Sequence, residues 1–218
     1  AMAQANPADG SASGIHWITS LPERFPSYLH IPLVLHEGWP GHLMHMALMQ
    51  EIDRLPPFRR INFEHYNAYI EGWALYCERL GVDMGLYKTP AEQYGQLEME
   101  MKRAVRLVVD TGLHALGWER QQAIDYLQQH LVQPKATIET EVNRYIGLPA
   151  QALSYKLGEL KIRELRQRAQ QALGERFTLK AFHDCVLATG PVTLSILDEH
   201  VQGWINEQSV NAQKKDSL

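Results

Sequence analysis

The chain has 218 residues, of which 45% are hydrophobic and 21% charged, and its formal net charge at pH 7 is −4. This length and composition are typical of one globular domain, or of one lobe of a larger protein, with a substantial core. The acidic balance gives no basic stripe for nucleic acid, so we predict no nucleic-acid partner. Because no run of about 18 apolar residues occurs, we predict no transmembrane segment in this chain. The compartment, exported or cytoplasmic, is left open.

The two ends of the chain have the composition of mobile segments. Residues 1–14 are small and polar with Gly, Ser and Pro, and residues 209–218 are similarly polar. We therefore expect a disordered N-terminal segment over 1–14, one helical domain over 15–208 and a mobile tail. Cys77 and Cys185 lie in apolar-periodic segments without CxxC spacing, which predicts buried core residues.

Between these ends the start and stop signals are repeatedly helical. Thr89-Pro-Ala-Glu92 is a capping box with proline at the first helical position, and it predicts a long helix that runs to Gly117. Further helices are expected over about 118–131 and 149–174, and two shorter ones after the threonines at 178 and 193. No period-2 segment is longer than a few residues. The sequence thus predicts an all-α fold, an irregular multi-helix assembly with little or no sheet.

His36-Glu37-Gly-Trp-Pro-Gly-His42 holds the residue types of a hydrolytic zinc site, which needs imidazole or carboxylate ligands and a carboxylate to take a proton from water. The helical HExxH arrangement is absent, because Pro40 occupies the i+4 position. In an ideal helix His42 would lie about 120° round and about 9 Å along from His36. Pro40 and Gly41 favour a broken or bulged turn, which could return His42 to the face of His36.

Two carboxylates follow about thirty residues later on an apolar helix face. Glu71 and Glu78 are seven residues apart and therefore share that face. Salt bridges would explain them, and so would a glutamate ligand backed by a second carboxylate. Likewise, the histidines could be ordinary residues of a half-buried helix. Spacing alone therefore leaves the metal site open.

Four ordered motifs resemble the bacterial DUF885 family, which itself resembles the gluzincin metallopeptidases. They are HEGWPGH at 36–42, EGWALY at 71–76, VDTGLHALGW at 109–118 and RYIGLPAQALSYKLG at 144–158. The similarity covers roughly residues 25–205. Members of that family are usually longer, which implies an N-terminal lobe or partner segment that completes the cleft.

The resemblance implies a zincin-like metal site on a broken helix, with Zn²⁺ held by His36, His42 and Glu71 and with Glu37 as general base. Where the family commonly has a second histidine directly after the first motif, this sequence has Leu43. Whether His45 replaces that histidine is left open.

Several other polar residues are candidates for supporting roles. Arg106, Asp110 and His114 recur at i, i+4 and i+8, so they line one stripe of the long helix. Asp110 is expected to orient His114, whose other nitrogen would face a substrate carbonyl or oxyanion. The alternative is an ion-pair ladder.

Tyr145 and Tyr155 are candidate oxyanion donors, with Tyr155 preferred, although tyrosines in such segments are commonly core residues. Lys156 and Arg144 are candidates to bind a terminal carboxylate, or are simply solvated charges.

We therefore expect a zinc-dependent hydrolase, specifically a metallopeptidase acting on a peptide or small amide. Glu37 would take a proton from the zinc-activated water and deliver it to the leaving amine, with Glu78, Asp110 and Arg106 behind the site. The alternatives are a zinc hydrolase of a non-peptide amide or ester, and a non-catalytic helical binding module with structural or vestigial metal. A structural zinc has four protein ligands, so His45 or His65 as a fourth would favour the last alternative.

Overall fold

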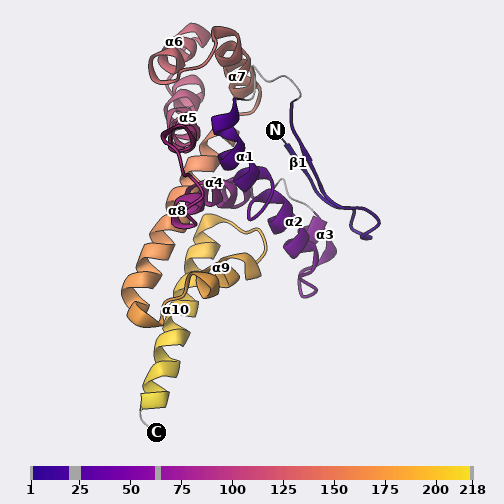
Figure 1. Cartoon of the computed structure of the whole chain (residues 1–218), viewed down its shortest axis with the longest axis vertical. Helices are drawn as coiled ribbons and strands as arrows, with labels where there is room; N and C mark the ends of the chain where they lie inside the picture. The colour runs from indigo at the N-terminus through magenta and orange to yellow at the C-terminus, as the bar shows by residue number, and fades with distance from the viewer. Residues whose placement is uncertain (1, 20–25, 62–64, 217–218) are drawn as a thin grey trace.

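The computed structural model describes residues 2–19, 26–61 and 65–216, and in these ranges it is an assembly of helices with one two-stranded sheet (Figure 1). In chain order the elements are β1 (Met2–Gln4), β2 (Ile15–Trp17), η2 (Ser27–Leu29), α1 (His30–Glu37), α2 (His42–Gln50), α3 (Pro57–Ile61), α4 (Asn67–Asp83), α5 (Pro90–Ala115), α6 (Arg120–His130), α7 (Lys135–Gly147), α8 (Gln151–Leu173), η3 (Gly174–Arg176), α9 (Leu179–Ala188) and α10 (Leu194–Asp216). The predicted all-α class is confirmed.

The centre of the molecule is the packing of α4 against α8 (Figure 1). Gly72 of α4 faces Gly158 of α8 so closely that a Cβ on either glycine would overlap backbone atoms of the opposite helix. Buried apolar residues of both helices join those of α9 and α10 in one core, which includes Trp73 and Phe182. Small residues at the crossing let the two backbones approach, and large ones on either side fill the core.

A second core lies among α5, α6 and α7, at the end of the molecule opposite the C-terminus of α10 (Figure 1). Val109, Ile124 and Val142 are fully buried there, one from each of the three helices. Asp110 connects this core to α8, because its carboxylate oxygens accept the backbone N–H of Ala150 at 3.1 and 3.3 Å. Ala150 precedes α8 in a left-handed conformation with φ of 67°.

α1 lies across α4 and α5, and α2 packs against α3, α4 and α9. The junction between α1 and α2 therefore lies over α4. Among the described residues no helix combines the length and the apolar character that crossing a bilayer requires.

The helix caps read from the sequence are confirmed. Thr89 Oγ1 accepts the backbone N–H of Glu92 at 3.2 Å, while the Glu92 carboxylate accepts that of Thr89 at 2.8 Å. Thr178 caps α9 by accepting from Ala181 at 3.2 Å. The long helix α5 ends at Ala115, two residues before the predicted stop.

Both ends of the chain differ from the sequence-based expectation. β1 and β2 form an antiparallel pair, Met2 opposite Trp17, so residues 2–4 of the segment expected to be disordered are in a strand. Asn6 then exchanges two hydrogen bonds with Gln50 of α2, at 2.7 and 3.0 Å. Three-residue strands carry too short a pattern to be recognised in the sequence. At the other end α10 is a long helix rather than a short one, and it continues to Asp216.

Gly72→Ala should lower the free energy of unfolding by about 1–3 kcal/mol, because the added methyl overpacks the α4–α8 crossing. Denaturant unfolding measures the change. Gly203→Ala in α10 is the matched control, since a Cβ there meets no heavy atom within 4 Å. The control variant should be as stable as the wild type or slightly more stable, because alanine favours the helix more than glycine does. Equal stability of Gly72→Ala and wild type would contradict the close packing.

Candidate metal centre

The break between α1 and α2 is built by glycine. α1 ends at Glu37, where Gly38 N–H still donates to Val34 O at 2.9 Å, and α2 begins at His42. A Cβ on Gly41 would overlap the backbone oxygens of Leu35 and His36. The φ of Gly41 is −73°, so the close backbone approach, and not a positive φ, accounts for the glycine at this position. The Trp39–Pro40 peptide bond is cis.

α4 holds this break in place. The indole Nε1–H of Trp73, a fully buried residue, donates to the backbone oxygen of Pro40 at 2.9 Å. Trp73 lies two residues after Glu71 on the same helix. The helix that anchors the break is therefore also the helix that carries the third candidate ligand.

The predicted return of His42 to the face of His36 is confirmed. Ligand atoms of His36, His42 and Glu71 all lie within 4.8 Å of one another. Nε2 of His36 and Nε2 of His42 are 3.4 and 3.2 Å from the same oxygen, Oε2 of Glu71. We call these three residues the His–His–Glu cluster. Their donor atoms are the types that zinc prefers.

A fully buried carboxylate stands behind the cluster. Glu78 Oε1 lies 2.7 Å from Nδ1 of His36, on the side of the ring away from Glu71, and 3.1 Å from Nη2 of Arg103. A carboxylate on the far nitrogen of a metal-binding histidine fixes its tautomer and ring orientation. Glu78 was expected to support the glutamate ligand, but its contact is with His36.

Sequence reasoning missed Arg103. Arg103 precedes Asp110 by seven residues and Arg106 by three, so it belongs to the polar stripe already recognised on the long helix. Its spacing of three and seven residues from Arg106 and Asp110 was the signal that could have found it.

The charges of neighbouring residues set the protonation states of His36 and Glu71. Burial alone would lower the pKa of His36, but the neighbouring carboxylates of Glu71 and Glu78 outweigh it and raise the pKa to about 9. Burial likewise opposes ionisation of Glu71, yet His36 and His42 hold its pKa well below the ordinary range. Protonated His36 thus stabilises the fold fully below its ordinary pKa of 6.5, and this contribution is lost as the pH rises through about 9.

These residues fit a zinc ion. Of the two carboxylates beside buried His36, Glu78 is paired with Arg103, and a proton on His36 balances the charge of the other. A divalent cation between neutral imidazoles and Glu71 meets the same need with the donor set that zinc takes.

Tyr155 is beside the cluster, as the sequence analysis preferred. Its ring stacks on that of His36, with centroids 6.2 Å apart and an interplanar angle of 16°. Gln151 Nε2 donates to its hydroxyl at 2.9 Å, and the guanidinium of Arg106 lies 4.7 Å from the ring centroid. Burial, and then the charge of Glu71, raise the pKa of Tyr155, so the phenol keeps its proton.

Other predicted site residues have different contacts. His114 is exposed, and its Nε2 lies 3.0 Å from the backbone oxygen of Tyr145, about 12 Å further along α5 than Arg106. Asp110 accepts from the backbone of Ala150, so it positions α8 and does not orient His114. The Tyr145 hydroxyl accepts from Arg106 and donates to Glu141, both at 2.8 Å. The expected contact of Asp110 with His114 is thus replaced by contacts of Asp110 with the start of α8 and of His114 with α7.

The candidate fourth ligands are outside the cluster. Among the described residues the group that could hold an ion is His36, His42 and Glu71, without His45 or His65. His45 is buried against the ring of Tyr69, with centroids 5.3 Å apart, and burial lowers its pKa to about 3.

The family described as bacterial protein of unknown function (DUF885) matches residues 1–201. The chain belongs to this family. No curated protein matches the chain.

Two solved structures are similar to this DUF885 chain. One is from Colwellia psychrerythraea, a protein classed provisionally as a lipoprotein, with 43% identity over 92% of the chain and a TM-score of 0.88. The other, from Shewanella oneidensis, is classed in the same provisional way with unknown function, and has 25% identity over 91% of the chain and a TM-score of 0.77. The DUF885 chain spans 34% and 38% of the lengths of these two proteins.

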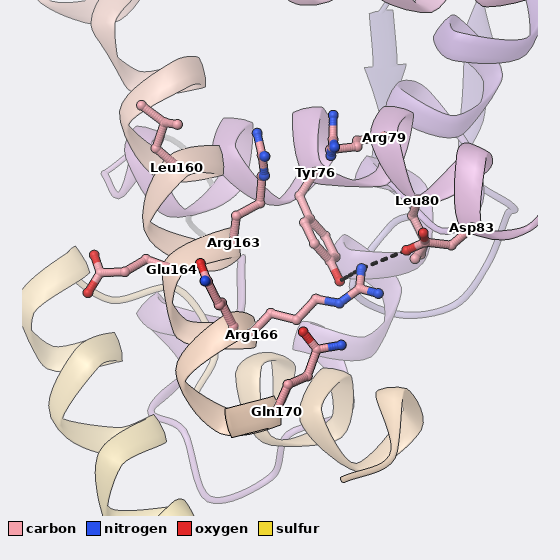
Figure 2. A pocket seen from close by; sticks show the side chains of 10 residues that line it. Tyr76, Arg79, Leu80, Asp83, Leu160, Arg163, Glu164, Arg166 and Gln170 are labelled. Carbon is pink, nitrogen blue, oxygen red and sulfur yellow. Dashed lines mark hydrogen bonds and ion pairs between the residues drawn. The ribbon is translucent and has the colours of Figure 1, made fainter. Parts of the chain in front are cut away.

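A hollow of about 470 Å³ lies elsewhere on this DUF885 chain, between α4 and α8 (Figure 2). Tyr76 lines it, about 140° round α4 from Glu71, so the hollow opens on the far side of the helix from the His–His–Glu cluster. Its arginines have carboxylate partners, such as Arg166 with Asp83 at 2.7 Å (Figure 2).

The DUF885 chain should bind zinc with one-to-one stoichiometry, because three donors converge. His36→Ala and His42→Ala should each abolish stoichiometric binding, and Glu71→Gln should weaken it, as measured by metal analysis and chelator competition. His130→Ala is the control, an exposed histidine whose Nδ1 lies 2.8 Å from the backbone oxygen of Tyr126. Full zinc retention by both cluster alanine variants would refute the assignment.

Glu78→Gln should reduce zinc affinity by about 10- to 100-fold, since it removes the carboxylate behind His36. It should also change proton release. In the wild type, His36 with a pKa near 9 is protonated at pH 7, so zinc displaces a proton, and this release fades above about pH 9. The Glu78→Gln variant should release fewer protons than the wild type when it binds zinc at pH 7. Calorimetry in buffers of different ionisation enthalpy measures both effects, with Asp83→Asn on another face of α4 as control. Unchanged affinity and proton release would contradict the role of Glu78.

Proposed function

We propose that this DUF885 chain carries the centre of a zinc-dependent hydrolase that cleaves peptide bonds. The observation that supports it most is the convergence of two imidazoles and one carboxylate, from α1, α2 and α4, with no fourth protein ligand among the described residues. A three-ligand site keeps a position for water, as catalytic zinc sites do, whereas structural zinc sites are closed by four ligands. When bound, zinc supplies Lewis acidity toward a water molecule and the scissile carbonyl.

Glu37 is the proposed general base. It directly follows His36, and its side chain leaves α1 about 100° round the helix axis from that of His36. The residue is 8% exposed and is the last of α1, next to the break. A carboxylate in that place takes a proton from the attacking water and returns it to the leaving amine.

Tyr155 is the proposed oxyanion donor. Its hydroxyl keeps its proton because burial and the charge of Glu71 raise its pKa, and a neutral phenol can donate to a developing negative charge. The stacking of its ring on His36 and the amide of Gln151 limit how the phenol can turn. This proposal gives to Tyr155 the role that sequence reasoning had shared among Tyr155, Tyr145 and His114.

We propose a class of substrate, namely peptides. This proposal rests on the likeness of the donor set to that of zinc peptidases. The chain spans about a third of the length of the two similar solved structures. The proposed N-terminal lobe or partner segment would then complete the walls of the cleft, while the His–His–Glu cluster supplies the donors.

Glu37→Gln should keep zinc and lose about 10²- to 10⁴-fold in turnover, because the amide cannot accept the proton of water. Zinc content is measured by metal analysis, and turnover by mass spectrometry of a peptide-library digest with zinc-loaded protein. The control is Glu51→Gln, an exposed carboxylate at the end of α2. Loss of zinc from Glu37→Gln would mean that Glu37 is a ligand, and full turnover would remove it from the mechanism.

A further inference from the structure

Four donors converge on one carboxylate oxygen between α5 and α7. Glu141 Oε2 lies 2.9 Å from Nη2 of Arg106, 3.1 Å from Nη2 of Arg144 and 3.5 Å from Nζ of Lys102. The Tyr145 hydroxyl donates to the same oxygen at 2.8 Å. One oxygen has too few lone pairs to satisfy four donors well.

The charges in this group do not balance. In the part of the chain that the structure describes, Glu141 is the one carboxylate paired with Lys102, Arg106 and Arg144. Three cations thus share one anion, although the Arg106 side chain is only 5% exposed and that of Lys102 only 19%. Excess positive charge of this kind away from water is costly unless an anion joins it.

The pKa of Lys102 reflects the same excess of positive charge. Burial lowers its pKa to about 8, the guanidiniums of Arg106, Arg103 and Arg144 act in the same direction, and Glu141 opposes them. A second anion near these side chains would favour the charged form of Lys102.

Two other partly buried cations among the described residues have more carboxylate around them. Lys156, which the sequence analysis paired with Arg144 as a candidate for a terminal carboxylate, has Glu100 and Glu159 as partners, both at 3.0 Å. Around the hollow of Figure 2, Arg163 pairs with Glu159 at 3.1 Å. Among the described ion pairs, Glu141 is the one carboxylate that three cations share without any of them having a second carboxylate partner.

This group is connected to the His–His–Glu cluster by two stacked contacts. The His36 and Tyr155 ring centroids are 6.2 Å apart, and the Arg106 guanidinium carbon is 4.7 Å from the Tyr155 centroid. Extended peptide advances about 3.3–3.6 Å per residue, so only a few residues of substrate span these two steps.

We propose that Lys102, Arg106 and Arg144 bind the C-terminal carboxylate of a short peptide whose scissile bond lies at the His–His–Glu cluster. This inference rests on the proposed function and deepens it, because it makes the enzyme an exopeptidase that cuts within a few residues of the C-terminus. Arginine suits this role because its planar guanidinium binds a carboxylate through two parallel hydrogen bonds. The side chain of Arg144 is 34% exposed, so it is open to an incoming ligand.

The experiment compares each peptide with a free C-terminal acid to the same peptide with a C-terminal amide. A set of peptides that the zinc-loaded protein cleaves is assayed for kcat/KM, and the acid should be cleaved about 10- to 100-fold faster than the amide. Arg144→Gln and Lys102→Met should each bring this ratio close to one. Matched controls are Arg120→Gln and Lys180→Met, two exposed positions, which should keep the wild-type ratio.

A binding assay separates this inference from the proposed function. Calorimetry with the zinc-loaded Glu37→Gln variant measures the affinity for the acid and amide forms of short peptides without turnover. Acid-selective binding that Arg144→Gln removes, in a protein that hydrolyses no peptide, would support the carboxylate site and refute the peptidase. Hydrolysis with equal rates and affinities for the acid and amide peptides would refute the carboxylate site and leave the proposed peptidase activity standing.

Stability is checked in parallel, because the same ion pairs connect α5 and α7. If Lys102→Met lowers the melting temperature, the more exposed Arg144→Gln decides the test. An Arg144→Lys variant keeps the charge but loses the planar fork, so it should recover part of the acid preference. Variants that lose stability while the acid-to-amide ratio stays unchanged would show that these cations only connect the helices, and would overturn the proposal.

Discussion

The contact on which the site depends most is that of the buried Glu78 carboxylate with His36 and Arg103. It joins α4, which carries Glu78, to α1 and to α5. A carboxylate with no exposure is stable only with partners of opposite charge or with strong donors, so the three helices must meet where those partners are. The orientation of the His36 ring, and through it the position of the His–His–Glu cluster, follows from this requirement.

α5 contributes cationic side chains to two separate groups of charged residues. Arg103 faces Glu78 behind the cluster, while Lys102 and Arg106 face Glu141. Tyr155 lies between the two groups, with its ring near His36 on one side and near the guanidinium of Arg106 on the other. The molecule thus places a group that attracts cations next to one that attracts anions. The proposed substrate, a peptide with a free C-terminal carboxylate, would place its negative end at the second group.

The features predicted correctly from the sequence depend on neighbouring residues. Thr89 and Thr178 cap helices within three residues, and Pro40-Gly41 breaks a helix where it stands. The heptad spacing of Glu71 and Glu78 likewise follows from one helix. These signals needed no knowledge of how helices meet.

The errors came from contacts between helices. Asp110 and His114 share a stripe, yet one contacts the start of α8 and the other contacts α7, because the partners of a helix face are set by the packing of distant segments. Arg103 was missed for the same reason. The N-terminal strands depend on pairing between residues 2–4 and 15–17, which a period of two over three residues cannot reveal.

The crossing of α4 and α8 at Gly72 and Gly158 links stability to chemistry. Glu71 directly precedes the first glycine, and Tyr155 precedes the second by three residues. No side chain separates the two backbones there, so the distance between the helices also sets the position of the Glu71 carboxylate relative to the Tyr155 phenol. The fold and the site are therefore coupled geometrically at this crossing. A change that widens this crossing therefore moves Glu71 and Tyr155 relative to each other as well as loosening the core.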